Sequence, residues 1–196
     1  MSGVTLSQEK ESKKLPSRAR KQLTVSTAVR RSTRKCSSLI KKEVTEDYIE
    51  MIKQGKVVDG LKVTEFEDKG RGVVATKYLS RGQYVCEYAG TLLSKDEAVV
   101  TEKEYEVDDT VGCYMYYFNF NRKEYCVDAT KEDKTVGRLI NHSRTKSNVK
   151  TKAIEVDGVP KLFFIATSDI TPDTELLYDY GDHSKQSHTS FPWLKL

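Results

Sequence analysis

The chain has 196 residues, and its content of 37% hydrophobic and 32% charged residues is typical of one globular domain with a tail. It contains neither an apolar run near the roughly 20 residues that a membrane span needs nor the hydrophobic stretch of a secretory signal, so we expect an intracellular protein without a membrane contact. No Cys-x-x-Cys pair is present, so we expect neither a disulfide framework nor a zinc or other metal site from Cys36, Cys86, Cys113 and Cys126.

The net charge of +4 is distributed unevenly along the chain. Residues 1–42 carry 12 Lys and Arg against 2 Asp and Glu, whereas the remaining residues carry 21 against 27. The basic segment is rich in Ser and Thr and poor in apolar residues, so it is predicted to be a disordered arm. Such arms bind polyanions, which favours non-specific DNA contact and nuclear import; a solvated terminus without a specific role is the open alternative.

Residues 43–60 are predicted to flank the domain and to contain one amphipathic helix, 43–53. Apolar residues recur in this helix at i, i+4, i+7 and i+8, the spacing of one helical face: Val44, Tyr48, Met51 and Ile52. Gly55 follows as a stop signal.

Short β-rich runs follow, separated by Gly, Asp and Asn: 61–66, 73–76, 84–88, 114–120, 125–127, 153–156 and 162–166. Ser94 and Glu97 match a capping box, so a surface helix is predicted over 95–107. Many short strands with only two or three helices indicate a compact, mostly β domain rather than a doubly wound α/β sheet.

A glycine-rich segment precedes the second run. Gly70, Arg71 and Gly72 with Ala75 match the dinucleotide pattern G-x-G-x-x-A, but that pattern must open a helix, and a strand is predicted here. A hairpin turn is favoured, and close approach of a ligand to the backbone is the alternative.

Two further segments are ambiguous by themselves. Asn141-His142-Ser143 satisfies the glycosylation pattern, which has no meaning in an intracellular protein, and a single His is more often structural than catalytic. Tyr178 and Tyr180 are two residues apart, so their hydroxyls share a side of an extended backbone and either line one pocket or belong to the core.

Taken together and in order, four segments resemble the SET domain of lysine methyltransferases. They are Lys-Gly-Arg-Gly at 69–72, Glu-Tyr-Ala-Gly at 87–90, Arg-Leu-Ile-Asn-His-Ser at 138–143 and Glu-Leu-Leu-Tyr-Asp-Tyr-Gly at 175–181. The resemblance covers roughly 43–196, with the domain itself at 61–183. Residues 112–118 and the Phe-Pro-Trp-Leu ending at 191–194 resemble the branch that monomethylates the lysine at position twenty of the histone H4 tail.

The resemblance implies a mostly β SET-domain fold with a few short helices and a knot-like C-terminal threading. In this threading, the Asn-His segment lies beneath the closing Tyr-Asp-Tyr segment. No cysteine follows Cys126, so no post-SET zinc cluster is expected, and residues 184–196 are expected to close the cofactor site instead. Ala89 departs from the family, where a bulkier His is expected, which affects the details of pocket packing.

The resemblance also assigns roles to individual residues. The methyl donor S-adenosyl-L-methionine is expected to be held by Lys69, Gly70, Arg71, Tyr114, Asn141 and His142, with Trp193 over its adenine. Tyr180 takes the position of the catalytic tyrosine, and Tyr178 the position that limits the product to one methyl group. Tyr88 and Cys113 are expected to complete the channel for the substrate lysine.

The function implied is monomethylation of a histone H4 tail lysine in nucleosomes by a nuclear, chromatin-associated monomer. The acidic folded part suits a basic tail, and the arm would contact nucleosomal DNA. Two alternatives stay open: a catalytically silent module that binds chromatin or histone tails, and a lysine methyltransferase for another histone or for a non-histone protein.

Overall fold

The computed structural model describes residues 37–105, 114–132 and 134–181, with side chains from residue 41 onward. These residues lie in one compact unit, Cys36–Leu196. Most of the predicted arm 1–42 and all of the predicted C-flanking segment 184–196 lie outside the described residues. The domain boundaries proposed from the sequence therefore stay predictions.

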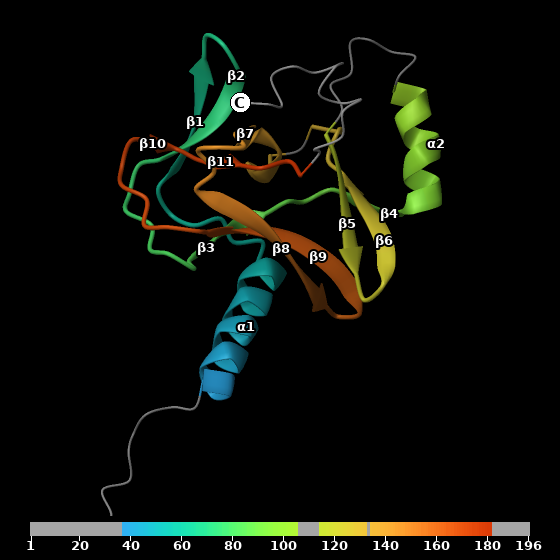
Figure 1. The fold of residues 1–196 in the computed structure, drawn as a ribbon, viewed down its shortest axis with the longest axis horizontal. Helices are drawn as coiled ribbons and strands as arrows, with labels where there is room; N and C mark the ends of the chain where they lie inside the picture. Colours follow the sequence, from blue (N-terminus) through green and yellow to red (C-terminus); the bar gives the residue numbers. More distant parts are fainter. Residues whose placement is uncertain (1–36, 106–113, 133, 182–196) are drawn as a thin grey trace, which may run out of the picture. The chain divides into compact units, whose positions relative to one another are not determined.

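The described part is mostly β, which confirms the predicted fold class (Figure 1). Its elements, in order, are α1 (Ser37–Lys53), β1 (Leu61–Phe66), β2 (Gly70–Ala75), β3 (Tyr84–Glu87), β4 (Thr91–Ser94), α2 (Lys95–Tyr105), β5 (Met115–Phe120), β6 (Lys123–Asp128), the 3-10 helix η1 (Gly137–Leu139), β7 (Asn141–His142), β8 (Val149–Val156), β9 (Val159–Ala166), β10 (Thr174–Glu175) and β11 (Leu177–Tyr178).

Four small sheets divide these strands, with the orders β1-β2-β10, β11-β7, β3-β9-β8 and β4-β6-β5. Hairpins link successive long strands, and the β5–β6 and β8–β9 turns both have positive φ at their two central residues. Such turns match the right-handed twist of the strands that they join. The strands β4, β7, β10 and β11 have only two to four residues, too few for periodicity to indicate them.

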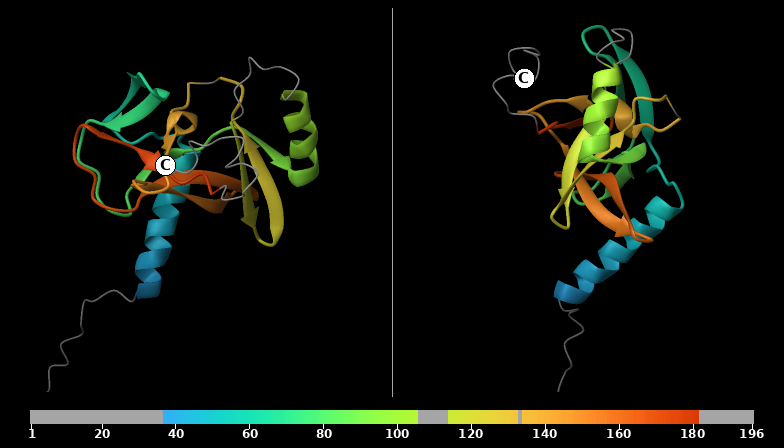
Figure 2. Two further views of the ribbon diagram at one scale, coloured as in Figure 1. Left: turned by 45° about the horizontal axis from the view of Figure 1, so that its top comes forward. Right: turned by 90° about the vertical axis from the view of Figure 1, so that its right-hand side faces the viewer.

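Helix α1 packs against the β3-β9-β8 sheet (Figures 1 and 2). Its inner face carries Tyr48 and Ile52; the Tyr48 ring centroid lies 5.1 Å from that of Phe163. The helix begins at Ser37, six residues before the predicted start, and Val44, which has the spacing of the apolar face, is exposed. Gly55, with a φ of +58°, ends the helix as predicted.

Helix α2 lies beside the β4-β6-β5 sheet (Figure 2). The predicted capping box at its start is confirmed: the Ser94 backbone N–H donates to Glu97 Oε2 at 2.9 Å, and the Glu97 N–H donates to Ser94 Oγ at 3.4 Å. Its fully buried Ala98 faces the sheet, and Tyr105 donates to Asp128 Oδ2 at 2.9 Å. The helix ends at Tyr105, where the described segment ends.

The main core lies between the β1-β2-β10 and β3-β9-β8 sheets and includes Val73, Val85, Phe164 and Leu176, all with at most 1% of their surface exposed. Tyr88 and Tyr178 belong to the same cluster, each with 4% exposed. Two of the tyrosines singled out from the sequence are therefore fixed by the close packing of the core.

Candidate active site

Tyr178 is the centre of an aromatic cluster. Its ring centroid lies 4.6 Å from that of Tyr180, 4.8 Å from Phe164 and 6.0 Å from Tyr116. Tyr88 completes the cluster at 5.7 Å from Tyr116 and 6.1 Å from Phe164. The structure thus brings Tyr88, Tyr178 and Tyr180 together, in agreement with the resemblance, and these distances are those of interacting aromatic pairs.

Parallel pairing of β7 with β11 brings the Asn-His and Tyr-Asp-Tyr segments side by side. Leu177 is opposite Asn141, and Tyr178 is opposite His142. The Tyr180 backbone N–H donates to Nδ1 of His142 at 3.1 Å, so the His142 proton in this arrangement is on Nε2. The juxtaposition agrees with the resemblance, whereas the knot-like threading itself stays a prediction.

The hydroxyls of the aromatic cluster donate mainly to main-chain oxygens. Tyr180 donates to the carbonyl of Ile140 at 3.3 Å, and Tyr88 donates to the carbonyl of Tyr114 at 3.0 Å. The Tyr116 hydroxyl shares a hydrogen bond with Thr151 Oγ1 at 2.9 Å. Oxygen dipoles held in fixed directions within a poorly hydrated site can stabilise positive charge that develops there.

Burial keeps the central phenols protonated. It raises the pKa of Tyr178 and of Tyr180 well above the ordinary phenol value, and the neighbouring tyrosines add to the effect. Burial also raises the pKa of Tyr116. At neutral pH these groups are therefore neutral hydrogen-bonding phenols and not phenolate bases.

A polar cluster adjoins the aromatic one and contains Lys69, Asn141 and Glu175. Glu175 accepts hydrogen bonds from Asn141 Nδ2 and from Lys69 Nζ, each at 3.0 Å. A Cβ on Gly72 would lie 2.6 Å from Asn141 Nδ2, so the missing side chain of Gly72 is what admits the amide. The glycine-rich segment belongs to the β1–β2 hairpin, as predicted. The side chain of Asn141 is the group that closely approaches Gly72.

Asn148 holds the segment that leads to Tyr178. Its Nδ2 donates to the Glu175 carbonyl at 2.8 Å, and its Oδ1 accepts from the Leu177 N–H at 2.9 Å. Sequence reasoning assigned no role to Asn148 or to the side chain of Glu175. Polar residues in a loop carry no pattern that reveals such a clamp, although Glu175 lies within one of the four motifs.

Two further residues expected to hold the methyl donor are Tyr114, just before β5, and Arg71, in β2. The Arg138 guanidinium carbon lies 3.9 Å from the Tyr114 ring centroid, and Arg138 is only 6% exposed. Arg71 is exposed and forms an ion pair with Glu132, and Gly70 opens β2 with a φ of +68°. Lys69, Gly70, Arg71, Tyr114, Asn141 and His142 are thus all among the described residues, whereas Cys113 and Trp193 lie outside them.

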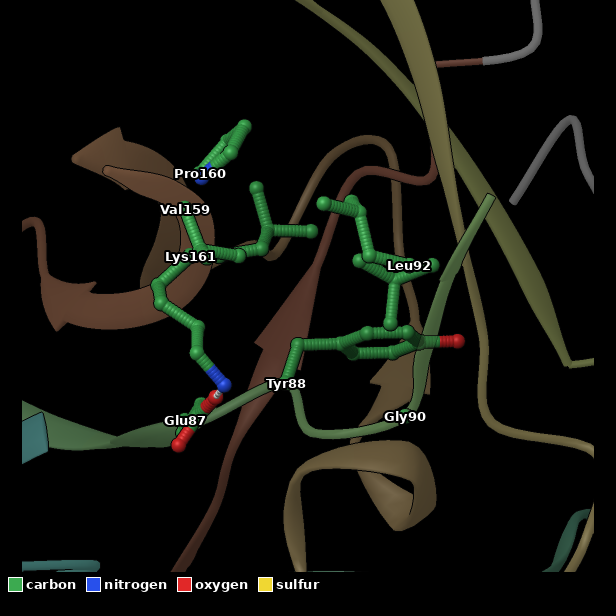
Figure 3. A pocket seen from close by; sticks show the side chains of 9 residues that line it. Glu87, Tyr88, Gly90, Leu92, Val159, Pro160 and Lys161 are labelled. Carbon is green, nitrogen blue, oxygen red and sulfur yellow. Dashed lines mark hydrogen bonds and ion pairs between the residues drawn. The ribbon is translucent and has the colours of Figure 1, made fainter. Parts of the chain in front are cut away.

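The Tyr88 ring also borders a small pocket, shown in Figure 3. This pocket of about 20 Å³ has room for about one water molecule, and it lies between Tyr88, Leu92 and the β9 residues Val159 and Lys161. Lys161 Nζ forms an ion pair with Glu87 at 3.0 Å, and the Tyr88 ring points away from this pair (Figure 3). The pocket is too small for a lysine side chain.

Three further observations concern possible metal ligands, membrane-spanning helices and cysteines among the described residues. Across residues 37–105, 114–132 and 134–181, no group of three or more His, Cys, Asp or Glu lies close enough to hold a metal ion. Over the same ranges, no helix has the length and apolar character needed to cross a bilayer. Cys86 and Cys126 are buried and form no disulfide, and burial raises the pKa of Cys86 to about 12.

A family model for the SET domain matches residues 70–181, more than half of the chain. The matched region contains the aromatic cluster, the β7–β11 pairing and Glu175. The chain therefore belongs to the SET-domain family.

The relatives narrow this assignment. The chain is 48% identical over 167 residues to N-lysine methyltransferase KMT5A-A of Danio rerio, which covers 85% of this chain and 48% of that protein. It is 42% identical over 166 residues to histone-lysine N-methyltransferase set-1 of Caenorhabditis elegans, covering 85% of this chain and 69% of the relative. The chain spans about half the length of the vertebrate relatives that it matches.

A solved structure agrees with these relatives. The crystal structure of CpSET8 from Cryptosporidium matches with a TM-score of 0.64 at 34% identity, covering 81% of this chain and 86% of that one. The likeness therefore extends to both fold and sequence.

Proposed function

We propose that this chain is a protein-lysine methyltransferase that uses S-adenosylmethionine to place one methyl group on a lysine of the histone H4 tail. The observation that carries the proposal is the packing of Tyr178 and Tyr180 against the Asn141-His142 segment through the β7–β11 pairing. The names of relatives that match 85% of this chain, which include a histone-lysine N-methyltransferase, support it.

The residues present fit the methyl donor. Lys69 offers an ammonium, Asn141 an amide and Tyr114 an aromatic ring, which suit the carboxylate, amino group and purine of an adenosyl amino acid. We assign Lys69, Gly70, Arg71, Tyr114, Asn141, His142 and Trp193 to its binding. When bound, S-adenosylmethionine supplies a methyl group on a positively charged sulfur.

The protein's part in the reaction is to align a neutral amine and to exclude water. Because the tyrosine rings leave little water near the substrate amine, its charged form is disfavoured and its pKa falls. Alignment of the amine with the methyl group supplies most of the remaining acceleration. Tyr180 is the proposed catalytic tyrosine, because its hydroxyl and the Ile140 carbonyl provide oxygen dipoles at this point.

Close packing accounts for the expected single methylation. Tyr178 is 4% exposed and is surrounded by Phe164, Tyr116 and Tyr180. Its hydroxyl occupies space that a methylated amine would need before a second transfer. Tyr88 and Cys113 are proposed to complete the channel.

The substrate, partners and location are further parts of the proposal. The excess of Asp and Glu outside residues 1–42 suits a basic histone tail, and the basic arm suits the phosphates of nucleosomal DNA. We place the protein in the nucleus on chromatin, as a monomer.

Mass spectrometry of recombinant nucleosomes incubated with the protein and S-adenosylmethionine tests the proposal. We expect one methyl group on the H4 tail lysine, lost with Tyr180→Phe and retained in the matched control Tyr78→Phe, a residue that is 54% exposed. No methylation by a protein that still binds S-adenosylmethionine would contradict catalysis of this substrate and favour a silent binding module or another target protein.

A further inference from the structure

The carboxylate of Glu175 connects two residues from distant segments. Its Oε1 accepts from Asn141 Nδ2 and its Oε2 accepts from Lys69 Nζ, both at 3.0 Å. The Glu175 side chain is 16% exposed, whereas that of Lys69 is 38% exposed. Both oxygens of one partly buried carboxylate are therefore used by residues that we assign to the methyl donor.

The backbone of Glu175 is fixed more firmly than that of Lys69. It lies on β10, where it pairs with Val74 of β2, and its carbonyl accepts from Asn148 Nδ2 at 2.8 Å. Lys69 instead lies in the β1–β2 turn, and its ammonium is carried by a flexible side chain. The position of Glu175 therefore sets where the Lys69 ammonium is held, whereas the backbone of Asn141 is fixed by its own pairing in β7.

The carboxylate also determines which way the Asn141 amide faces. A carboxylate only accepts hydrogen bonds, so Nδ2 of Asn141 must face Glu175, and Oδ1 is presented elsewhere as an acceptor. Lys69 uses one of its three N–H donors on Glu175. Asn141 and Lys69 together thus offer one acceptor and two donors. The acceptor matches the ammonium of a zwitterionic amino acid, and the donors match its carboxylate.

We propose that Glu175 is a positioning residue for the methyl donor: it orients the Asn141 amide and the Lys69 ammonium toward the amino-acid end of S-adenosylmethionine. The inference rests on the proposed function of this site. It assigns no contact between Glu175 and the reacting atoms.

Glu175→Gln is the matched substitution, because it keeps the shape and removes the charge. A glutamine amide can accept only through its oxygen, so either Lys69 loses its partner or Asn141 must reverse its amide. We expect the dissociation constants of S-adenosylmethionine and S-adenosylhomocysteine to rise about tenfold, which corresponds to about 1.4 kcal/mol. Calorimetric titration of the full chain measures both, with Glu155→Gln on the exposed side of β8 as control.

A double-mutant cycle separates positioning from a general structural effect. If Glu175 acts through Asn141, Glu175→Gln should weaken binding less than threefold in an Asn141→Ala background, because the two losses are then not additive. The unfolding temperature should stay near that of the wild type. Full additivity, or unchanged affinity in the single variant, would overturn the inference.

Two results distinguish this inference from the proposed function. If the wild type binds neither S-adenosylmethionine nor S-adenosylhomocysteine, the proposed function fails; if the wild type binds them and Glu175→Gln binds equally well, only the role of Glu175 fails. Should Glu175→Gln not fold, Glu175→Asp decides, because its shorter side chain keeps the charge but cannot reach both partners. Wild-type affinity in that variant would refute positioning.

Discussion

Replacing Asn148 by alanine removes the side chain that holds the strand leading to Tyr178. Two hydrogen bonds are lost, from Asn148 Nδ2 to the Glu175 carbonyl at 2.8 Å and from the Leu177 N–H to Asn148 Oδ1 at 2.9 Å. Leu177 is only 7% exposed, so its N–H would be left largely without water. An unsatisfied buried group costs about 1–3 kcal/mol, and a more accessible carbonyl costs less.

We therefore expect Asn148→Ala to lower the free energy of unfolding by about 2–4 kcal/mol. This value adds the cost of the unsatisfied Leu177 N–H to the smaller cost of the Glu175 carbonyl. Urea denaturation followed by circular dichroism measures the change, with Asn119→Ala on the exposed side of β5 as control. The expected effect of the control is within about 0.5 kcal/mol of zero. A loss below about 1 kcal/mol for Asn148→Ala, or one equal to the control, would refute this account of the clamp.

Three further predictions follow from the geometry of the site. Tyr178→Phe should allow a second methyl group on the product, and mass spectra that contain only monomethylated lysine would contradict the steric explanation. Gly72→Ala should raise the dissociation constant of S-adenosylmethionine at least about tenfold, because the new Cβ would lie 2.6 Å from Asn141 Nδ2; unchanged affinity by calorimetry would mean that Asn141 moves at little cost. Burial raises the pKa of Tyr178 and Tyr180, so their contribution to stability should be fully present below a pH of about 10 and fall as the pH rises further, because the unfolded chain then releases protons that the folded chain retains. Denaturation midpoints over this pH range, compared with Tyr180→Phe, test the sign.

Apolar spacing and capping residues predicted some strand and helix bounds correctly. Six-residue β1 was predicted with the observed bounds, and the Ser94 capping box places the start of α2 at Lys95. The start of α1 was wrong by six residues, although Ile40 lies four residues before Val44 and continues the apolar spacing on which the prediction depended. Val44 has the spacing of the apolar face but is exposed, because periodicity does not show where a neighbouring sheet ends.

The site was predictable in its members but not in its polar connections. Tyr178 and Tyr180 were expected on one side of an extended segment, and their ring centroids lie 4.6 Å apart. The resemblance joined Asn141 to that segment, which spacing alone does not do. The bonds from Glu175 to Lys69 and Asn141 depend on the register of β10 against β2, which forms only in the folded chain.

Because the site depends on the β7–β11 pairing, it forms only when the chain folds. Each strand contributes only two residues to a parallel ladder, and the two segments meet across a long stretch of intervening sequence. Such contacts carry an entropic cost, because the loop between them must close before they add stability. A ligand that touches both segments binds the folded chain alone, and it would therefore raise the unfolding temperature in proportion to the logarithm of its concentration above its dissociation constant.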